Sequence, residues 1–168
     1  FGLTPGICRD FFAAGVDAIT TGNHVYDQRE IIPFLDDCKK IVRPLNFPDG
    51  NAGRGICEVE LAGGKKLLVV QVMGRAFMED LDCPVQALEK VLRSYIMGAN
   101  ISAILVDIHA EATAEKLAFV HVFDGKVLGA VELEEVDKIV ANRKLITDNS
   151  LFERFNQFTD DIISYQQK

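Results

Sequence analysis

The chain has 168 residues, of which 48% are hydrophobic and 26% are charged, and its formal net charge is −7 at pH 7. This length and composition are typical of one domain with a real hydrophobic core and argue against a disordered segment. The acidic charge argues against general binding to nucleic-acid backbones, which needs a basic surface, but is compatible with a small phosphorylated substrate. The longest uncharged stretch, residues 94–106, is too short to cross a bilayer, so we expect no membrane partner.

The cysteines and the first five residues of the chain indicate the cellular compartment of the protein. The cysteines form no Cys-x-x-Cys pair and match no zinc spacing, and we expect each to be a small buried apolar residue with a reduced thiol. The chain opens Phe-Gly-Leu-Thr-Pro, without a basic start and without an initiator Met. These features predict a cytoplasmic protein whose numbered sequence begins inside a longer gene product. The four cysteines are Cys8, Cys38, Cys57 and Cys83.

Apolar periodicity predicts helices and strands in alternation, which is typical of an α/β fold. Thr4 and Pro5 are expected to begin the first helix, and Asp27 to cap the second. Ala62-Gly63-Gly64-Lys65 predicts the turn of a β-hairpin. The expected helices are 5–14, 27–38, 82–98, 113–123, 132–144 and 150–163, and the expected strands are 16–21, 41–43, 56–61, 66–72, 101–108 and 127–131.

Polar residues follow two apolar strands, as Gly22-Asn23-His24 and as His109-Ala110-Glu111. Strands of one sheet bring such ends to a common rim, where a ligand can bind. An amide oxygen and an imidazole can both bind a divalent metal, and a second imidazole can act as a general acid. Arg75, after the strand 66–72, could contact a phosphate oxygen. Each residue also has a structural interpretation, because a strand-end histidine is often only hydrogen-bonded, Asn23 suits a left-handed turn and Arg75 could be solvated.

Several segments occur together in an order that resembles the YmdB-like branch of the calcineurin-like bacterial metallophosphoesterases. Gly-Asn-His alone is moderately specific, whereas the combination is highly specific. The resemblance covers residues 1 to about 131. The matching segments are FGLTP (1–5), AGVDAITTGNHVYD (14–27), RPLNFP (43–48), MGRAFM (73–78) and DIHAEATAEK (107–116).

The resemblance implies a four-layer α/β/β/α sandwich with two divalent metal ions, of which iron or manganese are expected. It also implies hydrolysis of cyclic-nucleotide phosphodiesters, and hence a small phosphodiester as the substrate. By resemblance, Asn23 and His109 would be ligands of one metal, and His24 would donate a proton to the leaving oxygen. Arg75 is the expected contact to substrate.

The chain departs from the family in ways that bear on activity. The aspartate and Glu-Asn metal ligands of the family's first strands precede the point where this chain begins. The family's Gly-Thr-His-Thr-His segment is absent, and Glu132-Leu133-Glu134-Glu135 stands in its place. Two neutral ligands without a bridging carboxylate do not hold a dinuclear centre. The sequence therefore predicts an incomplete sandwich over residues 1–131, followed by a divergent helical tail over residues 132–168.

Two functional hypotheses follow. The first is a fragment of a metal-dependent cyclic-nucleotide phosphodiesterase that is inactive, or nearly so, as this chain alone. The second is a non-catalytic binding or interaction domain on a degenerate scaffold, with self-association as one role for the amphipathic tail. A truncated or rearranged gene, an error in the predicted gene and a genuine replacement would each explain that tail.

Overall fold

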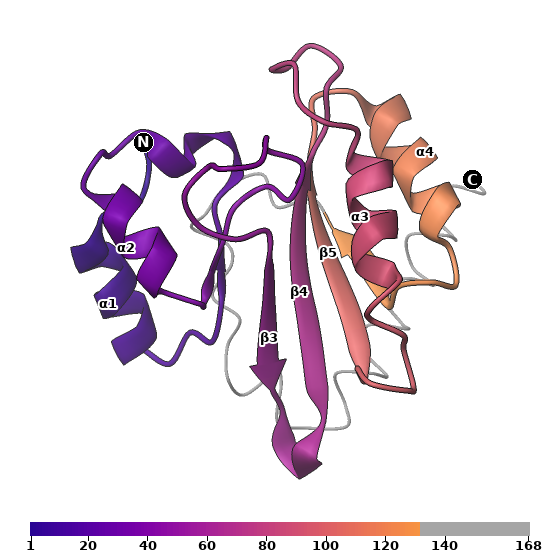
Figure 1. Ribbon diagram of the computed structural model, residues 1–168, viewed down its shortest axis with the longest axis horizontal. Helices are drawn as coiled ribbons and strands as arrows, with labels where there is room; N and C mark the ends of the chain where they lie inside the picture. The colour runs from indigo at the N-terminus through magenta and orange to yellow at the C-terminus, as the bar shows by residue number, and fades with distance from the viewer. Residues whose placement is uncertain (132–168) are drawn as a thin grey trace, which may run out of the picture.

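The computed structural model describes residues 1–131, and it shows a mixed α/β fold (Figure 1). The predicted tail over residues 132–168 lies outside the described residues. The helices are α1 (Pro5–Ala13), α2 (Ile31–Asp37), α3 (Pro84–Leu92) and α4 (Thr113–Phe123), with the short 3-10 helices η1 (Gly22–Tyr26) and η2 (Ala62–Gly64). The strands are β1 (Ile19–Thr20), β2 (Ile41–Val42), β3 (Ile56–Glu60), β4 (Lys66–Met73), β5 (Ala103–His109) and β6 (Gly129–Val131).

Two sheets organise these elements. β1 and β2 pair in parallel, and a second sheet has the strand order β3-β4-β5-β6. β3 runs antiparallel to β4, which confirms the predicted hairpin, and β4, β5 and β6 are parallel. Met73 lies opposite His109 in the β4–β5 register, so both long strands finish at the same edge of the sheet.

The two faces of the larger sheet pack against different partners. Alternation along β4 sends Leu68, Val70 and Val72 to one face, where they join the core formed with α3 and α4. The opposite face of β3 and β4 packs against Val42 of β2 through Val69. Figure 1 accordingly shows α3 and α4 together on one side of the molecule and α1 and α2 on the other.

A buried glutamine of β4 connects the two sheets. Gln71 is 2% exposed and lies on the face directed toward β1. Its Oε1 accepts hydrogen bonds from the backbone N–H groups of Thr21 and Gly22, each at 3.0 Å. Its Nε2 donates to Oδ2 of Asp107 on β5 at 2.9 Å. Because a buried amide must have hydrogen-bond partners, this side chain fixes the end of β1 to the centre of the larger sheet.

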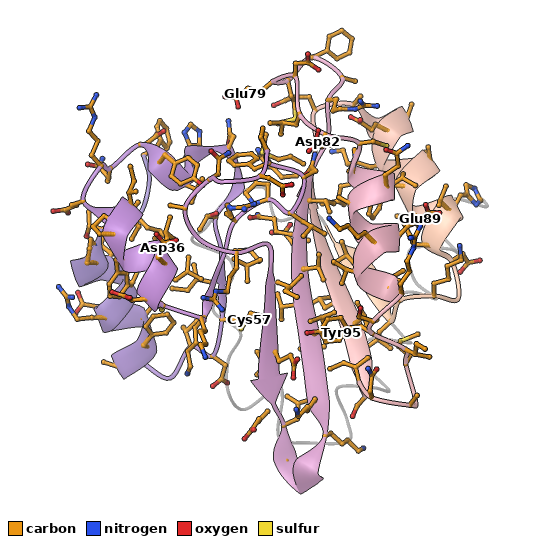
Figure 2. All side chains as sticks on the ribbon, viewed as in Figure 1. Asp36, Cys57, Glu79, Asp82, Glu89 and Tyr95 are labelled. Atoms are coloured by element: carbon orange, nitrogen blue, oxygen red, sulfur yellow. The ribbon has the colours of Figure 1, made fainter. Side chains whose placement is uncertain are left out.

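The segment between β2 and β3 extends the connection. Leu45 N–H donates to the Gln71 carbonyl oxygen at 2.7 Å. The side chain of Asn46, which is 1% exposed, accepts from Met73 N–H at 2.8 Å and donates to the Met73 and Asp82 carbonyl oxygens, each at 2.9 Å. Asp82 is labelled in Figure 2, where it lies close to the end of the sheet. The predicted loop over residues 44–55 is therefore held along β4 at Leu45 and Asn46.

Three predicted element ends are wrong for identifiable reasons. The first strand begins at Ile19 rather than at residue 16, because Val16 N–H donates to the Phe11 carbonyl oxygen and so terminates α1. α2 begins at Ile31 with Glu30 at its N-cap, because Asp27 bonds to a histidine side chain instead of capping the helix.

α3 ends at Leu92, well before the predicted end at residue 98. The Asn100 side chain accepts from Ile96 N–H and donates to the Ser94 carbonyl oxygen, so it replaces helical hydrogen bonds. Tyr95, labelled in Figure 2, donates its hydroxyl to Glu58 Oε1 at 2.9 Å and is thereby drawn toward β3.

The cysteine prediction holds in part. All four thiols are free, but only Cys8 and Cys57 are buried, whereas Cys38 and Cys83 are half-buried. Burial is the main cause that raises the pKa of the Cys8 thiol to about 11, because desolvation penalises the thiolate. Within residues 1–131, no helix is both long enough and apolar enough to cross a bilayer.

Replacing Gln71 tests the connection between the sheets. Gln71→Leu keeps the volume but removes the acceptor of two backbone N–H groups and one hydrogen bond to the Asp107 carboxylate. Unmet buried polar groups cost about 1–3 kcal/mol each, so we expect a loss of roughly 2–4 kcal/mol in the free energy of unfolding, measured in urea. Gln86→Ala, an exposed change on α3, is the control, with an expected effect within about 0.5 kcal/mol. A Gln71→Leu loss no larger than that of the control would contradict this role.

Candidate active site

The Gly22-Asn23-His24 turn directly follows β1, and the Gln71 side chain holds it. Gly22 has φ +67°, a left-handed conformation that suits glycine. A Cβ atom at Gly22 would lie 3.7 Å from Cδ2 of His109, so the imidazole of His109 packs against this turn. The ends of β1 and β5 therefore meet, as predicted, through the contact between Gly22 and the ring of His109.

Asn23 is half-buried in η1, one residue after the contact with His109. His109 is half-buried as the last residue of β5, and its carbonyl oxygen accepts from Gly74 N–H at 2.8 Å. The backbone beyond β4 is thus fixed to the end of β5.

His24 presents its imidazole near the surface. Its Nδ1 lies 2.8 Å from Oδ2 of Asp27, and 48% of its side chain is exposed. A carboxylate can only accept here, so Nδ1 donates and Nε2 is left as the nitrogen available to a ligand. The ring of Phe1 stacks on the imidazole with centroids 4.9 Å apart and planes at 22°. These contacts orient the imidazole of His24, and the bond to Asp27 sets the tautomer of its neutral form.

Arg75 follows β4 on the same edge of the sheet and is exposed. Its backbone N–H donates to both carboxylate oxygens of Glu115, at 2.9 and 3.0 Å, and Ala76 N–H donates to Oε2 at 3.2 Å. Glu115 lies in the first turn of α4, so this carboxylate joins the loop after β4 to the helix after β5. Gly74 has no room for a side chain, because a Cβ there would lie 2.6 Å from Cβ of Ala110.

The described residues do not fit a metal centre. Across residues 1–131, no group of three or more His, Cys, Asp or Glu side chains could hold a metal ion. Three carboxylates of the surrounding elements accept hydrogen bonds within the fold: Asp27 from His24, Glu115 from the loop after β4 and Asp107 from Gln71. Asn23 and His109 would offer two neutral donors, and Glu132, Glu134 and Glu135 lie outside the described residues.

The residues that position the site escape prediction from sequence. Gln71 carries one usable signal, since it is a polar residue inside the apolar run Leu-Leu-Val-Val-Gln-Val-Met and must be hydrogen-bonded if buried. The local pattern indicates a helix cap for Asp27, and it indicates no role for Glu115 or Asn46.

Comparisons with known proteins define the class. A family model described as "YmdB-like protein" matches residues 1–131. A Bacillus subtilis (strain 168) protein named "2',3'-cyclic-nucleotide 2'-phosphodiesterase" is 42% identical over 130 residues, covering 77% of this chain and 48% of the relative. A Mycoplasma pneumoniae "Putative phosphatase/phosphodiesterase" is 34% identical over 120 residues, covering 68% of this chain and 41% of the relative. The fold and these relatives define a hydrolase family of the phosphatase and phosphodiesterase type.

Two solved structures resemble the fold of this chain. A hypothetical protein from Thermus thermophilus matches with TM-score 0.71 and 41% identity, covering 78% of this chain and 50% of that one. A novel phosphatase from Mycoplasma pneumoniae matches with TM-score 0.65 and 30% identity, covering 75% and 45%. The chain belongs to the YmdB-like family, which confirms the resemblance found in the sequence. It spans about half the length of the relatives it matches.

The tautomer of His24 is directly measurable. In the neutral ring we expect the proton on Nδ1, because Asp27 accepts it, and a bare Nε2 in long-range ¹H–¹⁵N spectra. Asp27→Ala removes the acceptor, and we expect the proton to distribute between the two nitrogens. The exposed His121 of α4 is the internal control and should not respond. A His24 proton that stays on Nδ1 in Asp27→Ala would contradict this orienting role.

Proposed function

We propose that residues 1–131 form a partial metallophosphoesterase domain that acts on small phosphodiesters, with cyclic nucleotides as the substrate class. The observation that carries this proposal is the packing of the His109 imidazole against Gly22, which brings the ends of β1 and β5 to one rim. The relatives named as phosphodiesterases supply the reaction class. The matching domain would be part of a four-layer α/β/β/α sandwich, and residues 132–168 a separate tail.

The proposed roles follow from position. His24, oriented by Asp27 and protonated on both ring nitrogens, donates the Nε2 proton to the leaving oxygen when the P–O bond breaks, and returns to the neutral tautomer with its proton on Nδ1. This transfer avoids an unstable alkoxide. Arg75, exposed beside the rim, contacts a phosphate oxygen. Asn23 and His109 are the residues we assign to a divalent metal, of which the family would hold two, iron or manganese.

These two neutral donors do not complete such a centre, so we propose that this chain by itself has little or no hydrolytic activity. A general acid without an activated nucleophile lacks the larger part of the catalytic machinery. We place the protein in the cytoplasm, with a phosphodiester as its partner and neither nucleic acid nor membrane.

A second candidate is a non-catalytic binding or interaction domain on a degenerate scaffold. Two observations favour it. No metal-holding group is found among residues 1–131, and α4 exposes three apolar side chains, Leu117, Val120 and Val122. Self-association into a homo-oligomer would bury such side chains.

Turnover and binding separate these proposals. We expect the chain with added Mn²⁺ or Fe²⁺ to hydrolyse bis(p-nitrophenyl) phosphate at the background rate, the same as His24→Ala. We also expect 2′,3′-cyclic AMP to shift the backbone resonances of Gly22, His24, His109 and Arg75.

Robust metal-dependent turnover that His24→Ala abolishes would overturn the inactivity of this chain. Shifts confined to α4, or no shifts at all, would instead overturn the assignment of the rim as the substrate site. The exposed change Gln86→Ala is the control in both measurements.

A further inference from the structure

The loop after β4 contains a turn with an unusual residue in it. Met78 N–H donates to the Arg75 carbonyl oxygen at 3.2 Å and closes a four-residue turn. Phe77, at the third position, has φ +63°, and it is the only non-glycine residue among those described with positive φ. A turn with positive φ at this position alone is of type II, where glycine or asparagine is the ordinary residue. A bulky aromatic side chain is strained there.

Packing within the fold does not explain the aromatic ring. Phe77 is 94% exposed, so its side chain gains almost nothing from burial. A strained conformation at a non-glycine residue persists only where the surroundings impose it, and such residues gather at ligand-binding sites. The position thus combines a conformation that favours glycine with a side chain that contributes nothing to the core.

The surroundings do impose this turn. Glu115 accepts the N–H groups of Arg75 and Ala76, and Met78 packs partly buried against the core cluster beside α1 and α2. The turn is held on both sides of Phe77, so the ring is projected from a fixed support.

The turn is also close to the proposed site. Gly74 N–H bonds to the His109 carbonyl oxygen, and the three residues from Gly74 to Phe77 span at most about 10 Å. Figure 1 shows the loop between β4 and α3 rising from the edge where β4 and β5 end. Glu79, labelled in the same region of Figure 2, and Asp80 give this loop negative charge.

We propose that Phe77 is a stacking platform for the nucleobase of the substrate, an inference that rests on the proposed function. A base has a neutral, flat π face, and an exposed phenyl ring binds it without regard to sequence. The carboxylates of Glu79 and Asp80 and the net charge of −7 oppose additional phosphates. The ligand chemistry that fits is therefore a single cyclic nucleotide, with its phosphate at His24 and His109 and its base on Phe77, rather than a polynucleotide.

The chain contains no tryptophan, so Phe77→Trp places a single indole fluorophore at the turn. We expect 2′,3′-cyclic AMP to quench its fluorescence saturably, and ribose 2,3-cyclic phosphate, which lacks the base, to leave it unchanged. Ile96→Trp, at an exposed site that follows α3, is the matched control and should not be quenched beyond collisional background.

Calorimetric titration measures how tightly the Phe77 variants bind 2′,3′-cyclic AMP. We expect Phe77→Asn, which suits the turn, and Phe77→Leu, which keeps an apolar side chain, to bind 2′,3′-cyclic AMP roughly tenfold more weakly than the original chain. Binding of ribose 2,3-cyclic phosphate should change less than twofold. Thermal unfolding of Phe77→Asn at or above the original midpoint would show that the fold is intact.

Three results would overturn the proposal. The first is an affinity of Phe77→Asn for 2′,3′-cyclic AMP equal to that of the original chain, and the second is no binding of 2′,3′-cyclic AMP by the original chain at millimolar concentration. The third is a change in molecular mass, measured by sedimentation, that depends on Phe77, because it would assign the ring to contact with a second copy. His109→Ala separates the two proposals. If Phe77 variants bind normally while His109→Ala binds weakly, the stacking role fails and the site stands. If the reverse holds, the ring binds a base but the assigned phosphate site is wrong.

Discussion

The hydrogen bonds of the Gln71 side chain determine how the two sheets meet. One amide oxygen accepts the N–H groups of Thr21 and Gly22, and the amide nitrogen donates to Asp107. β1 has only two residues and, within residues 1–131, pairs only with the equally short β2, so its own ladder gives little fixation. The end of β1 is instead fixed by a side chain of β4, a long strand that is buried on both faces from Leu68 onward. The position of the Gly22-Asn23-His24 turn therefore depends on β4.

From this constraint the candidate site follows stepwise. Gly22 adopts a left-handed conformation against the His109 ring, which lies at the end of β5. Gly74 bonds to the His109 backbone, and Glu115 then holds the loop that carries Arg75. Each contact joins segments distant in sequence, and together they bring the ends of β1, β4 and β5 to one rim. The proposed phosphodiester site lies at this rim, in a chain that belongs to the YmdB-like family.

Sequence alone predicted the elements better than their ends or their partners. The strand patterns that flank Ala62-Gly63-Gly64-Lys65 located the β3–β4 hairpin, and an almost wholly apolar run located β5, because a strand buried on both faces requires such a run. The ends of α2 and α3 were missed because Asp27 and Asn100 direct their side chains to groups that local patterns do not reveal. Likewise, strand ends indicated His24 and His109 as residues of interest. Gln71 and Glu115 act across separations of about 50 and 40 residues, and no local pattern specifies such pairs.

The contact between the ring of His109 and the Gly22 turn is the most direct test of this structure, because the site exists only if β1 and β5 end together. Nuclear Overhauser spectroscopy on the chain with labelled histidine measures it. If Gln71 holds the turn as described, a cross-peak joins the His109 Hδ2 proton to the Gly22 Hα protons. Absence of that cross-peak, with His109 instead showing contacts to another element, would contradict the assembly of the site.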